Sequence, residues 1–279
     1  MIPNGLPASP EPLPSPVLDS HTHLDIVSAE RGTAATTWSV TDQIHAATAV
    51  GVDRFIQVGV DVDSSRWAAA LAASEKAVLA TVALHPNEAP RLSDLDSALA
   101  SISELAGLDR VRGVGETGLD YYRTSGPGLA AQERSFRAHI ALAKRVDKTL
   151  VVHDRDAHAD ILRVLDDEGA PANVVMHCFS GDAAFASACV ERGFLLSFAG
   201  TVTFRNAPQL REAAALTPVS QILVETDAPY LTPMPHRGKP NASYLIPLTV
   251  RALAEVKGMP LDELCEAISA NGERAFGPW

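Results

Sequence analysis

Residues 149–177 read TLVVHDRDAHADILRVLDDEGAPANVVMH, and this stretch indicates the fold class most clearly. Two short apolar runs, Thr149–Val152 and Val174–Met176, flank a charged segment over residues 156–168. Short β-branched runs are typical of buried parallel strands, and the segment between them is long enough for a crossover helix. Each run ends at a histidine, so the stretch predicts a strand–helix–strand unit with an imidazole after both strands.

The same alternation runs through most of the chain. Further apolar runs predict strands at residues 17–20, 54–60, 78–84, 111–115, 194–198 and 221–224. Helices are expected at residues 41–49, 64–75, 93–106, 130–146, 182–191, 208–215, 243–257 and 261–270. Ser93 and Asp96 resemble a capping box at the start of one of them. Eight strands separated by helices predict an α/β fold of the (β/α)8 TIM-barrel type, and an open doubly wound sheet is the alternative.

The domain organisation predicted from the sequence is simple. Residues 1–16, MIPNGLPASPEPLPSP, contain six prolines and predict an extended arm with little structure of its own. Residues 17–279 show no internal repeat and no low-complexity linker, so they are expected to form a single barrel domain. The arm has neither the basic nor the apolar region of a secretory signal. No stretch approaches the roughly 18 consecutive apolar residues of a membrane span, so no membrane association is expected.

Composition limits the partners and the compartment. The 23 basic and 34 acidic residues give a formal net charge of −11, which repels polyanions on average. Any nucleic-acid function must therefore depend on a local site. The three cysteines form no CxxC pair, which argues against a disulfide framework and a cysteine-based zinc site. A reducing cytoplasm is the expected location.

Polar side chains gather where the predicted strands end. Because the carboxyl ends of barrel strands meet at one face, these side chains are expected to converge in space. Imidazoles and carboxylates in such a set are typical ligands of divalent metal ions, and one carboxylate such as Glu116 could bridge two ions. The set comprises five histidines and two acids: His21, His23, His85, His153, His177, Glu116 and Asp227.

Three further features of the sequence are a glycine-rich segment, one acid and one histidine. The segment from Gly113 to Gly118 matches GxGxxG, but a loop sequence follows it where a dinucleotide site needs a helix, so no nucleotide cofactor is expected. The glycines are instead expected to let the backbone pass close to a metal site. Glu225 shares a face with Asp227 and is expected to be a polar group inside the barrel. His139 lies in a helical segment and is expected at the surface.

Seven motifs occur in an order that resembles the TatD family of metal-dependent deoxyribonucleases, within the amidohydrolase-like barrels. They are DSHTHLD, ALHP, GVGETGLDYY, VVHDRDAH, MHCFSG, LVETDAPYL and PHRGKPN, and they extend from about residue 17 to the C-terminus. The resemblance implies two divalent metal ions per chain, with zinc, manganese, magnesium or nickel as candidates. It implies six ligands, of which Glu116 and Asp227 would also be catalytic: His21, His23, Glu116, His153, His177 and Asp227.

The resemblance and the neighbouring loops also suggest substrate contacts. His85 matches the first histidine of the family's HPH-type segment, where Asn87 replaces the second. Arg237 and Lys239 match the family's RGKxN loop and could grip a phosphate. Arg155 follows His153, and Tyr121 follows the Glu116 strand and could stack on a base.

These features predict a metal-dependent phosphodiesterase that hydrolyses DNA, acting like an exonuclease on single-stranded ends through metal-activated water. The alternative is hydrolysis of another ester, lactone, amide or phosphotriester bond on the same barrel, because the fold does not set the substrate. A non-enzymatic metal-holding scaffold is a third interpretation, against which the complete ligand set argues. The sequence does not predict the oligomeric state.

Overall fold

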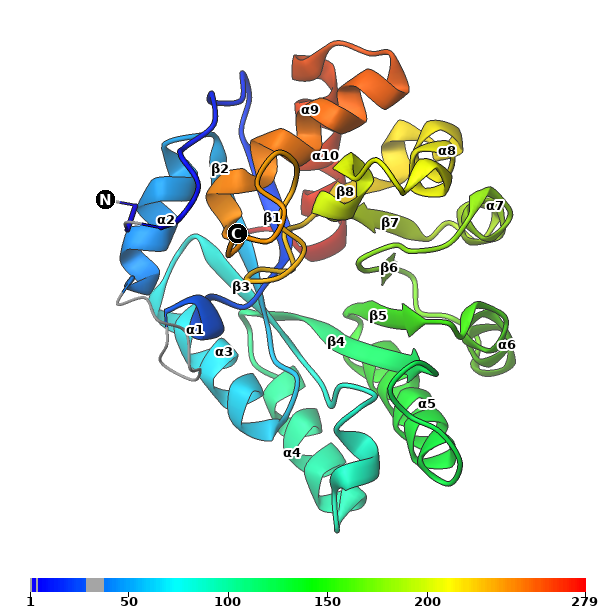
Figure 1. Ribbon diagram of the computed structural model, residues 1–279. Coiled ribbons are helices and arrows are strands. Elements are labelled where there is room, and N and C mark those ends of the chain that lie inside the picture. The colour runs from blue at the N-terminus through cyan, green and yellow to red at the C-terminus, as the bar shows by residue number, and fades with distance from the viewer. Residues whose placement is uncertain (1, 4, 29–37) are drawn as a thin grey trace. The chain divides into compact units, whose positions relative to one another are not determined.

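The computed structural model describes residues 2–3, 5–28 and 38–279. Its strands form one eight-stranded sheet whose order follows the chain, from β1 to β8 (Figure 1). The paired strands are parallel at β3–β4, β4–β5, β5–β6 and β7–β8. This strand order, with a helix following nearly every strand, confirms the (β/α)8 barrel rather than the doubly wound sheet. The strands are β1 Val17–Thr22, β2 Val52–Val58, β3 Val78–Val82, β4 Val111–Asp120, β5 Thr149–Arg155, β6 Val174–Met176, β7 Leu195–Phe198 and β8 Ile222–Val224.

The helices lie close to the predicted positions. The sequence did not indicate the one-turn helix α1, and the helix expected from residue 243 begins at residue 246 after a 3₁₀ turn. The bounds are α1 Leu24–Val27, α2 Val40–Thr48, α3 Val62–Ser74, α4 Leu95–Ala106, α5 Gly128–Val146, α6 His158–Glu168, α7 Ala183–Glu191, α8 Pro208–Leu216, α9 Ile246–Lys257 and α10 Leu261–Phe276.

Two local expectations were wrong. The N-cap of α4 is Asp94, whose side chain accepts a hydrogen bond from the Ser97 backbone N–H, so Ser93 and Asp96 form no capping box. Helix α10 continues past residue 270 because tertiary contacts favour the extra turns. Within that extension the Asn271 amide donates to the carbonyls of Val219 and Ile222.

The chain groups into two compact units. Unit 1 comprises residues 1–56, 181–187 and 196–274, and unit 2 comprises residues 57–180, 188–195 and 275–279. In unit 1 a parallel bridge between Thr22 and Ala228 brings the end of β1 beside the segment that follows β8. In unit 2 the helices α4, α5 and α6 pack against β4 and β5 (Figure 1). The assignment of residues 17–279 to a single domain stays a prediction.

The proline-rich arm belongs to unit 1 and forms hydrogen bonds with other residues of that unit. It contains no helix or strand in its described residues, as expected. The Leu13 backbone N–H donates to the Val50 carbonyl, and the Leu13 side chain is buried. The Tyr244 hydroxyl donates to the Pro7 carbonyl at 2.7 Å, and Arg251 donates to the Pro12 carbonyl. The contacts of Tyr244 and Arg251 use backbone carbonyls that a proline-rich segment leaves without partners of its own.

Candidate metal sites and their surroundings

Unit 1 carries one cluster of possible metal ligands. His21 and His23 lie at the end of β1, and Asp227 follows β8; their ligand atoms all lie within 4.8 Å of one another. Asp227 Oδ1 is 3.5 Å from His23 Nε2 and 3.8 Å from His21 Nε2. Both histidines are buried, whereas 17% of the Asp227 side chain is exposed. The structure therefore brings together three of the predicted ligands, with the carboxylate reaching solvent. These three residues are named below as cluster 1.

The backbone holds cluster 1 in place. The Asp227 N–H donates to the His21 carbonyl at 2.9 Å, and the His23 N–H donates to the Ala228 carbonyl at 3.1 Å. Asp227 has a φ of 52°, a left-handed conformation that aspartate tolerates better than most side chains. The buried Asn241 amide donates to the carbonyls of Thr226 and Tyr230, so it braces the loop that presents Asp227.

Asp19, a buried carboxylate next to His21, is not among the residues that the sequence motifs pointed to. Asp19 is fully buried and accepts hydrogen bonds from the Thr226 hydroxyl at 2.5 Å and the Thr226 N–H at 2.9 Å. Burial raises the pKa of Asp19 to about 7, although these hydrogen bonds act in the opposite direction. Asp19 precedes His21 by two residues, so strand alternation places it on the same face and could have revealed it. Glu225 is also fully buried, as expected of an interior polar group.

Unit 2 carries a second cluster around Glu116. Three imidazoles approach Glu116 Oε2: His177 Nε2 at 2.9 Å, His153 Nδ1 at 3.2 Å and His85 Nε2 at 3.7 Å. Glu116 lies in β4, His153 lies in β5, His177 follows β6 and His85 lies just beyond β3. Three histidines that are far apart in the sequence thus converge on one carboxylate oxygen. These histidines and Glu116 are named below as cluster 2.

His85 differs from the other members of cluster 2 in its protonation. Its Nδ1 accepts a hydrogen bond from the Asn87 backbone N–H at 3.0 Å, and a backbone N–H is always the donor. The proton of the neutral ring must therefore lie on Nε2, which faces Glu116. Burial lowers the pKa of His85 to about 4, so the ring is neutral near pH 7. In this arrangement His85 presents an N–H donor to the cluster rather than a lone pair.

Asp120 and Asn87 lie next to His153. Asp120 Oδ2 is 3.4 Å from His153 Nε2 and accepts a hydrogen bond from the Asn87 side-chain amide at 2.8 Å. The Arg123 N–H donates to the other carboxylate oxygen at 2.8 Å. Burial alone would raise the pKa of Asp120, but the adjacent His153 ring and the hydrogen bond from Asn87 outweigh burial and hold the pKa well below its usual range.

The GxGxxG segment has a structural explanation. Strand β4 continues through this segment to Asp120, and no helix begins within the segment. A Cβ atom on Gly115 would overlap Val151, and one on Gly118 would overlap the carbonyl oxygen of His153. The glycines therefore allow close approach of β4 to β5 beside His153, as expected from the sequence.

His139 is fully buried, so the expectation of a surface position was wrong. Its Nδ1 lies 2.7 Å from the Ser135 carbonyl oxygen, and its Nε2 accepts a hydrogen bond from the Leu84 N–H at 3.2 Å. These two backbone partners define a neutral ring with the proton on Nδ1. Burial lowers the pKa of His139 to about 4. A histidine on a helix gives no sign of which face it occupies until the helix packs.

The predicted substrate contacts have different surroundings. The Tyr121 hydroxyl donates to Asp160 at 2.8 Å, whereas the neighbouring Tyr122 is 65% exposed. The Arg155 guanidinium lies 4.1 Å from the centre of the Tyr122 ring. In unit 1 the Arg237 guanidinium lies 4.4 Å from the centre of the Phe204 ring, and both Arg237 and Lys239 are exposed. Tyr122 therefore offers a free aromatic face more readily than the predicted Tyr121.

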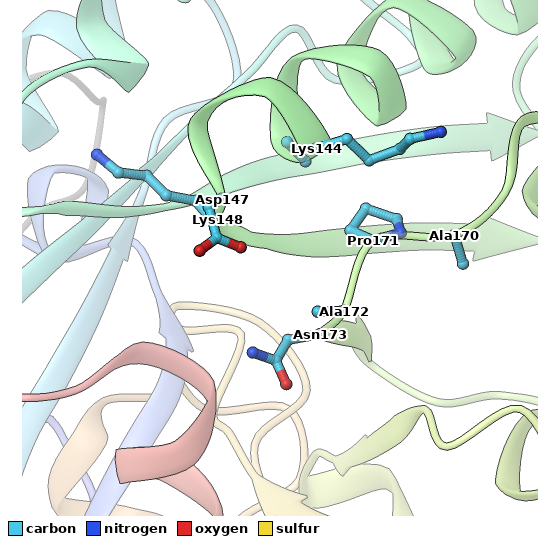
Figure 2. Close-up of a pocket in the computed structure, with 8 residues that line it drawn as sticks. Lys144, Asp147, Lys148, Ala170, Pro171, Ala172 and Asn173 are labelled. Atoms are coloured by element: carbon cyan, nitrogen blue, oxygen red, sulfur yellow. The ribbon is translucent and has the colours of Figure 1, made fainter.

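A separate pocket in unit 2 has a structural role instead. It has a volume of about 160 Å³ and lies at the amino-terminal ends of β5 and β6, away from the ends that carry His153 and His177 (Figure 2). Its lysines bind backbone carbonyls at or near the ends of helices. Lys144 Nζ donates to the Glu168 carbonyl, and Lys148 Nζ donates to the carbonyls of Ala106 and Leu108. In a (β/α)8 barrel this end of the strands contributes stability rather than chemistry.

The donor atoms of both clusters fit a divalent metal ion. Imidazole nitrogen and carboxylate oxygen together suit zinc, manganese and similar ions. Glu116 Oε2 with its surrounding ring nitrogens, and Asp227 Oδ1 with two further ring nitrogens, are convergent sets of this kind. Such a donor set on a (β/α)8 barrel defines the class of metal-dependent hydrolases.

Comparison with known proteins identifies the family. The sequence profile of the family described as TatD related DNase matches residues 18–277, so the chain belongs to this family. The chain is 46% identical to the uncharacterized metal-dependent hydrolase TatD of Mycobacterium tuberculosis, over 94% of this chain and 98% of that protein. It is 35% identical to the uncharacterized metal-dependent hydrolase YabD of Bacillus subtilis, over 93% and 98% of the two chains.

A solved structure supports the same conclusion. The crystal structure of YjjV, a TatD homologue from Escherichia coli, is similar to this chain with a TM-score of 0.85 and 26% identity. The match covers 94% of this chain and 98% of that one. The protein is thus a metal-dependent hydrolase of the TatD type. In the part of the chain that the structure describes, no helix is long and apolar enough to cross a membrane.

Proposed function

We propose that the protein is a metal-dependent phosphodiesterase that hydrolyses DNA, acting from single-stranded ends. The observation that carries the proposal is the pair of histidine–carboxylate clusters in a chain of the TatD-related DNase family. Each cluster would hold one divalent ion, giving two per chain. His21, His23 and Asp227 would bind one ion; Glu116, His153 and His177 would bind the other.

The metal ions would lower the pKa of a water molecule and neutralise charge on the phosphoryl oxygens. Asp227 has the exposure needed to accept the proton of the attacking water, because 17% of its side chain reaches solvent. His85 would donate its Nε2–H to a phosphoryl oxygen, because its Nδ1 is occupied by the Asn87 N–H. Glu116 would act as a ligand around which the imidazoles are ordered.

Charge supports a preference for strand ends. The overall charge of −11 opposes binding along a duplex, where affinity depends on neutralising many phosphates. The cations proposed to contact substrate are few: Arg155, Arg237 and Lys239. A small set of this kind suits the end of one strand. Tyr122, with Arg155 against its ring, could receive a terminal base.

The test is hydrolysis of end-labelled single-stranded DNA by protein stripped with a chelator, after adding back magnesium, manganese, zinc or nickel. We expect metal-dependent shortening from one end, and slower shortening of blunt duplex DNA. Glu116→Ala should lose this activity. Glu104→Ala, an exposed substitution on α4, is the matched control and should keep it.

The same preparation separates the competing hydrolase. A folded, metal-loaded protein that leaves DNA intact but cleaves an ester, lactone, amide or phosphotriester would overturn the DNA proposal and keep the metal site. Activity that survives in Glu116→Ala would identify a contaminating nuclease or an incorrect ligand assignment.

A further inference from the structure

We propose that Asp120 and Asn87 are positioning residues that set His153 for metal binding. Asp120 lies beside Nε2 of His153, where it would accept the Nε2–H once an ion occupies Nδ1, and Asn87 holds Asp120 in that place. The inference rests on the metal site of the proposed function and assigns a role to the residue that departs from the family's HPH-type segment.

The two ring nitrogens of His153 face different partners. Nε2 is 3.4 Å from Asp120 Oδ2, and Nδ1 is 3.2 Å from Glu116 Oε2. A neutral imidazole carries one proton, and only one nitrogen can offer a lone pair to a metal. Without an ion, Nδ1 is hydrogen-bonded to the Glu116 carboxylate, whereas Nε2 makes no hydrogen bond with any described residue. An ion bound to Nδ1 would take the lone pair of that nitrogen and leave the ring proton on Nε2, facing Asp120, on the side opposite to Glu116. A carboxylate behind a ligating histidine is the usual means of selecting its tautomer.

Asn87 is built into this arrangement at three points. Its side-chain N–H donates to Asp120 Oδ2 at 2.8 Å, and its side-chain oxygen accepts from the Thr124 hydroxyl at 3.0 Å. Its backbone N–H donates to His85 Nδ1 at 3.0 Å. The Thr124 contact orients the amide so that its N–H, rather than its oxygen, faces the carboxylate. One residue therefore influences two histidines, His85 directly and His153 through Asp120.

Asp120 itself is held as a rigid acceptor. Only 1% of the residue is exposed, and its second oxygen accepts from the Arg123 N–H at 2.8 Å. Its backbone N–H donates to the side-chain oxygen of Gln132, which is also buried. A buried carboxylate requires such donors. The result is a fixed negative charge beside His153, which increases the basicity of the opposite ring nitrogen.

The test measures metal binding in the full chain, without requiring turnover. The dissociation constants of Zn²⁺ would be measured by chelator competition, and the bound ions at saturation would be counted by elemental analysis. For Asp120→Asn we expect about 10–100-fold weaker binding of one ion, with the saturated stoichiometry unchanged, because outer partners of ligands typically have effects of this size. For Asn87→Ala we expect a smaller loss, because the Arg123 N–H still holds the carboxylate.

Two matched controls substitute exposed residues of the same kind, Asp109→Asn and Asn206→Ala, and should bind as wild type does. The second measurement is NMR of the His153 ring in the zinc-loaded protein, where the ion occupies Nδ1 and the proton lies on Nε2. We expect the Nε2–H proton to be protected from exchange and shifted downfield by Asp120 in wild type, and to lose part of both in Asp120→Asn, a change that a purely structural role would not produce. If Asp120→Asn fails to fold, Asn87→Ala provides both measurements.

The outcomes are distinct. Unchanged dissociation constants and an unchanged Nε2–H resonance in both variants would overturn the inference. Loss of one ion at saturation in Asp120→Asn would also overturn it, because Asp120 would then be a ligand. Wild-type protein that binds two ions and leaves DNA intact would refute the DNA proposal alone. Wild-type DNA cleavage with normal metal binding in Asp120→Asn would refute this inference alone.

Discussion

Gly118 shows how one residue without a side chain lets β4 approach β5 beside His153. Its φ is 144°, and a Cβ atom there would overlap the carbonyl oxygen of His153. Gly118→Ala should lower the free energy of unfolding by about 1–3 kcal/mol from backbone strain alone. The overlap of the new Cβ atom with the His153 carbonyl should add a further loss, because it pushes β4 away from β5. Urea unfolding would measure the loss. Gly126→Ala, at a φ of 58° with nothing within 4 Å, isolates the strain. Equal losses in the two variants would contradict the proposed overlap.

His139 makes a second prediction at the scale of the residue. Burial lowers its pKa to about 4, so the unfolded chain binds a proton between pH 6.5 and pH 4 that the folded chain does not. Stability should be complete above about pH 6.5 and decrease as the pH falls toward 4, by an amount on the order of 3 kcal/mol from this group. His139→Gln, which can donate and accept without charging, should show a shallower decrease in urea unfolding across this range. Parallel curves for the two proteins would show that His139 does not contribute.

At the scale of elements, the fastening of the arm depends on a few hydrogen bonds. Tyr244 is 1% exposed and packs edge-to-face with Trp38, with its hydroxyl on the Pro7 carbonyl. Tyr244→Phe keeps the packing and removes the hydrogen bond, so we expect about 1 kcal/mol of lost stability and faster proteolysis within residues 5–12. Thermal unfolding and timed digestion would measure both. Tyr122→Phe, an exposed substitution, should change neither. Unchanged digestion of Tyr244→Phe would indicate that the arm is held by other contacts.

At the scale of the whole molecule, charge sets how DNA binding responds to salt. Three cations proposed to contact phosphates predict a slope of about −2 for the logarithm of the association constant against the logarithm of salt concentration, since each single-strand phosphate contributes about 0.7. Fluorescence anisotropy with a labelled single strand and the Asp227→Asn variant would give the slope without turnover. Removing Lys239 by substitution with alanine should reduce it by about 0.7. A slope several times steeper would mean that the protein contacts many more phosphates than these three cations, which would contradict the proposal.

Much of the fold could be predicted because it depends on local patterns. Apolar runs mark the strands, and His177 directly follows β6 as predicted, whereas β5 continues to Arg155, so His153 lies inside its strand rather than after it. The substrate residues could not be selected from such patterns. Tyr121 and Tyr122 are adjacent and chemically alike, and only packing against Asp160 distinguishes the one that is occupied from the one that is exposed.

Local patterns in the chain predicted the succession of strands and helices, the barrel class and the polar residues at or near the ends of the strands, because each follows from periodicity within a few residues. Which polar groups meet depends on the tertiary structure. Asp120 and Asn87 are separated by 33 positions, and Tyr121 and Asp160 by 39. The burial of His139 likewise depends on how the elements pack. Hydrogen-bond partners between distant residues are set by distances in space, and no local pattern in the chain encodes them.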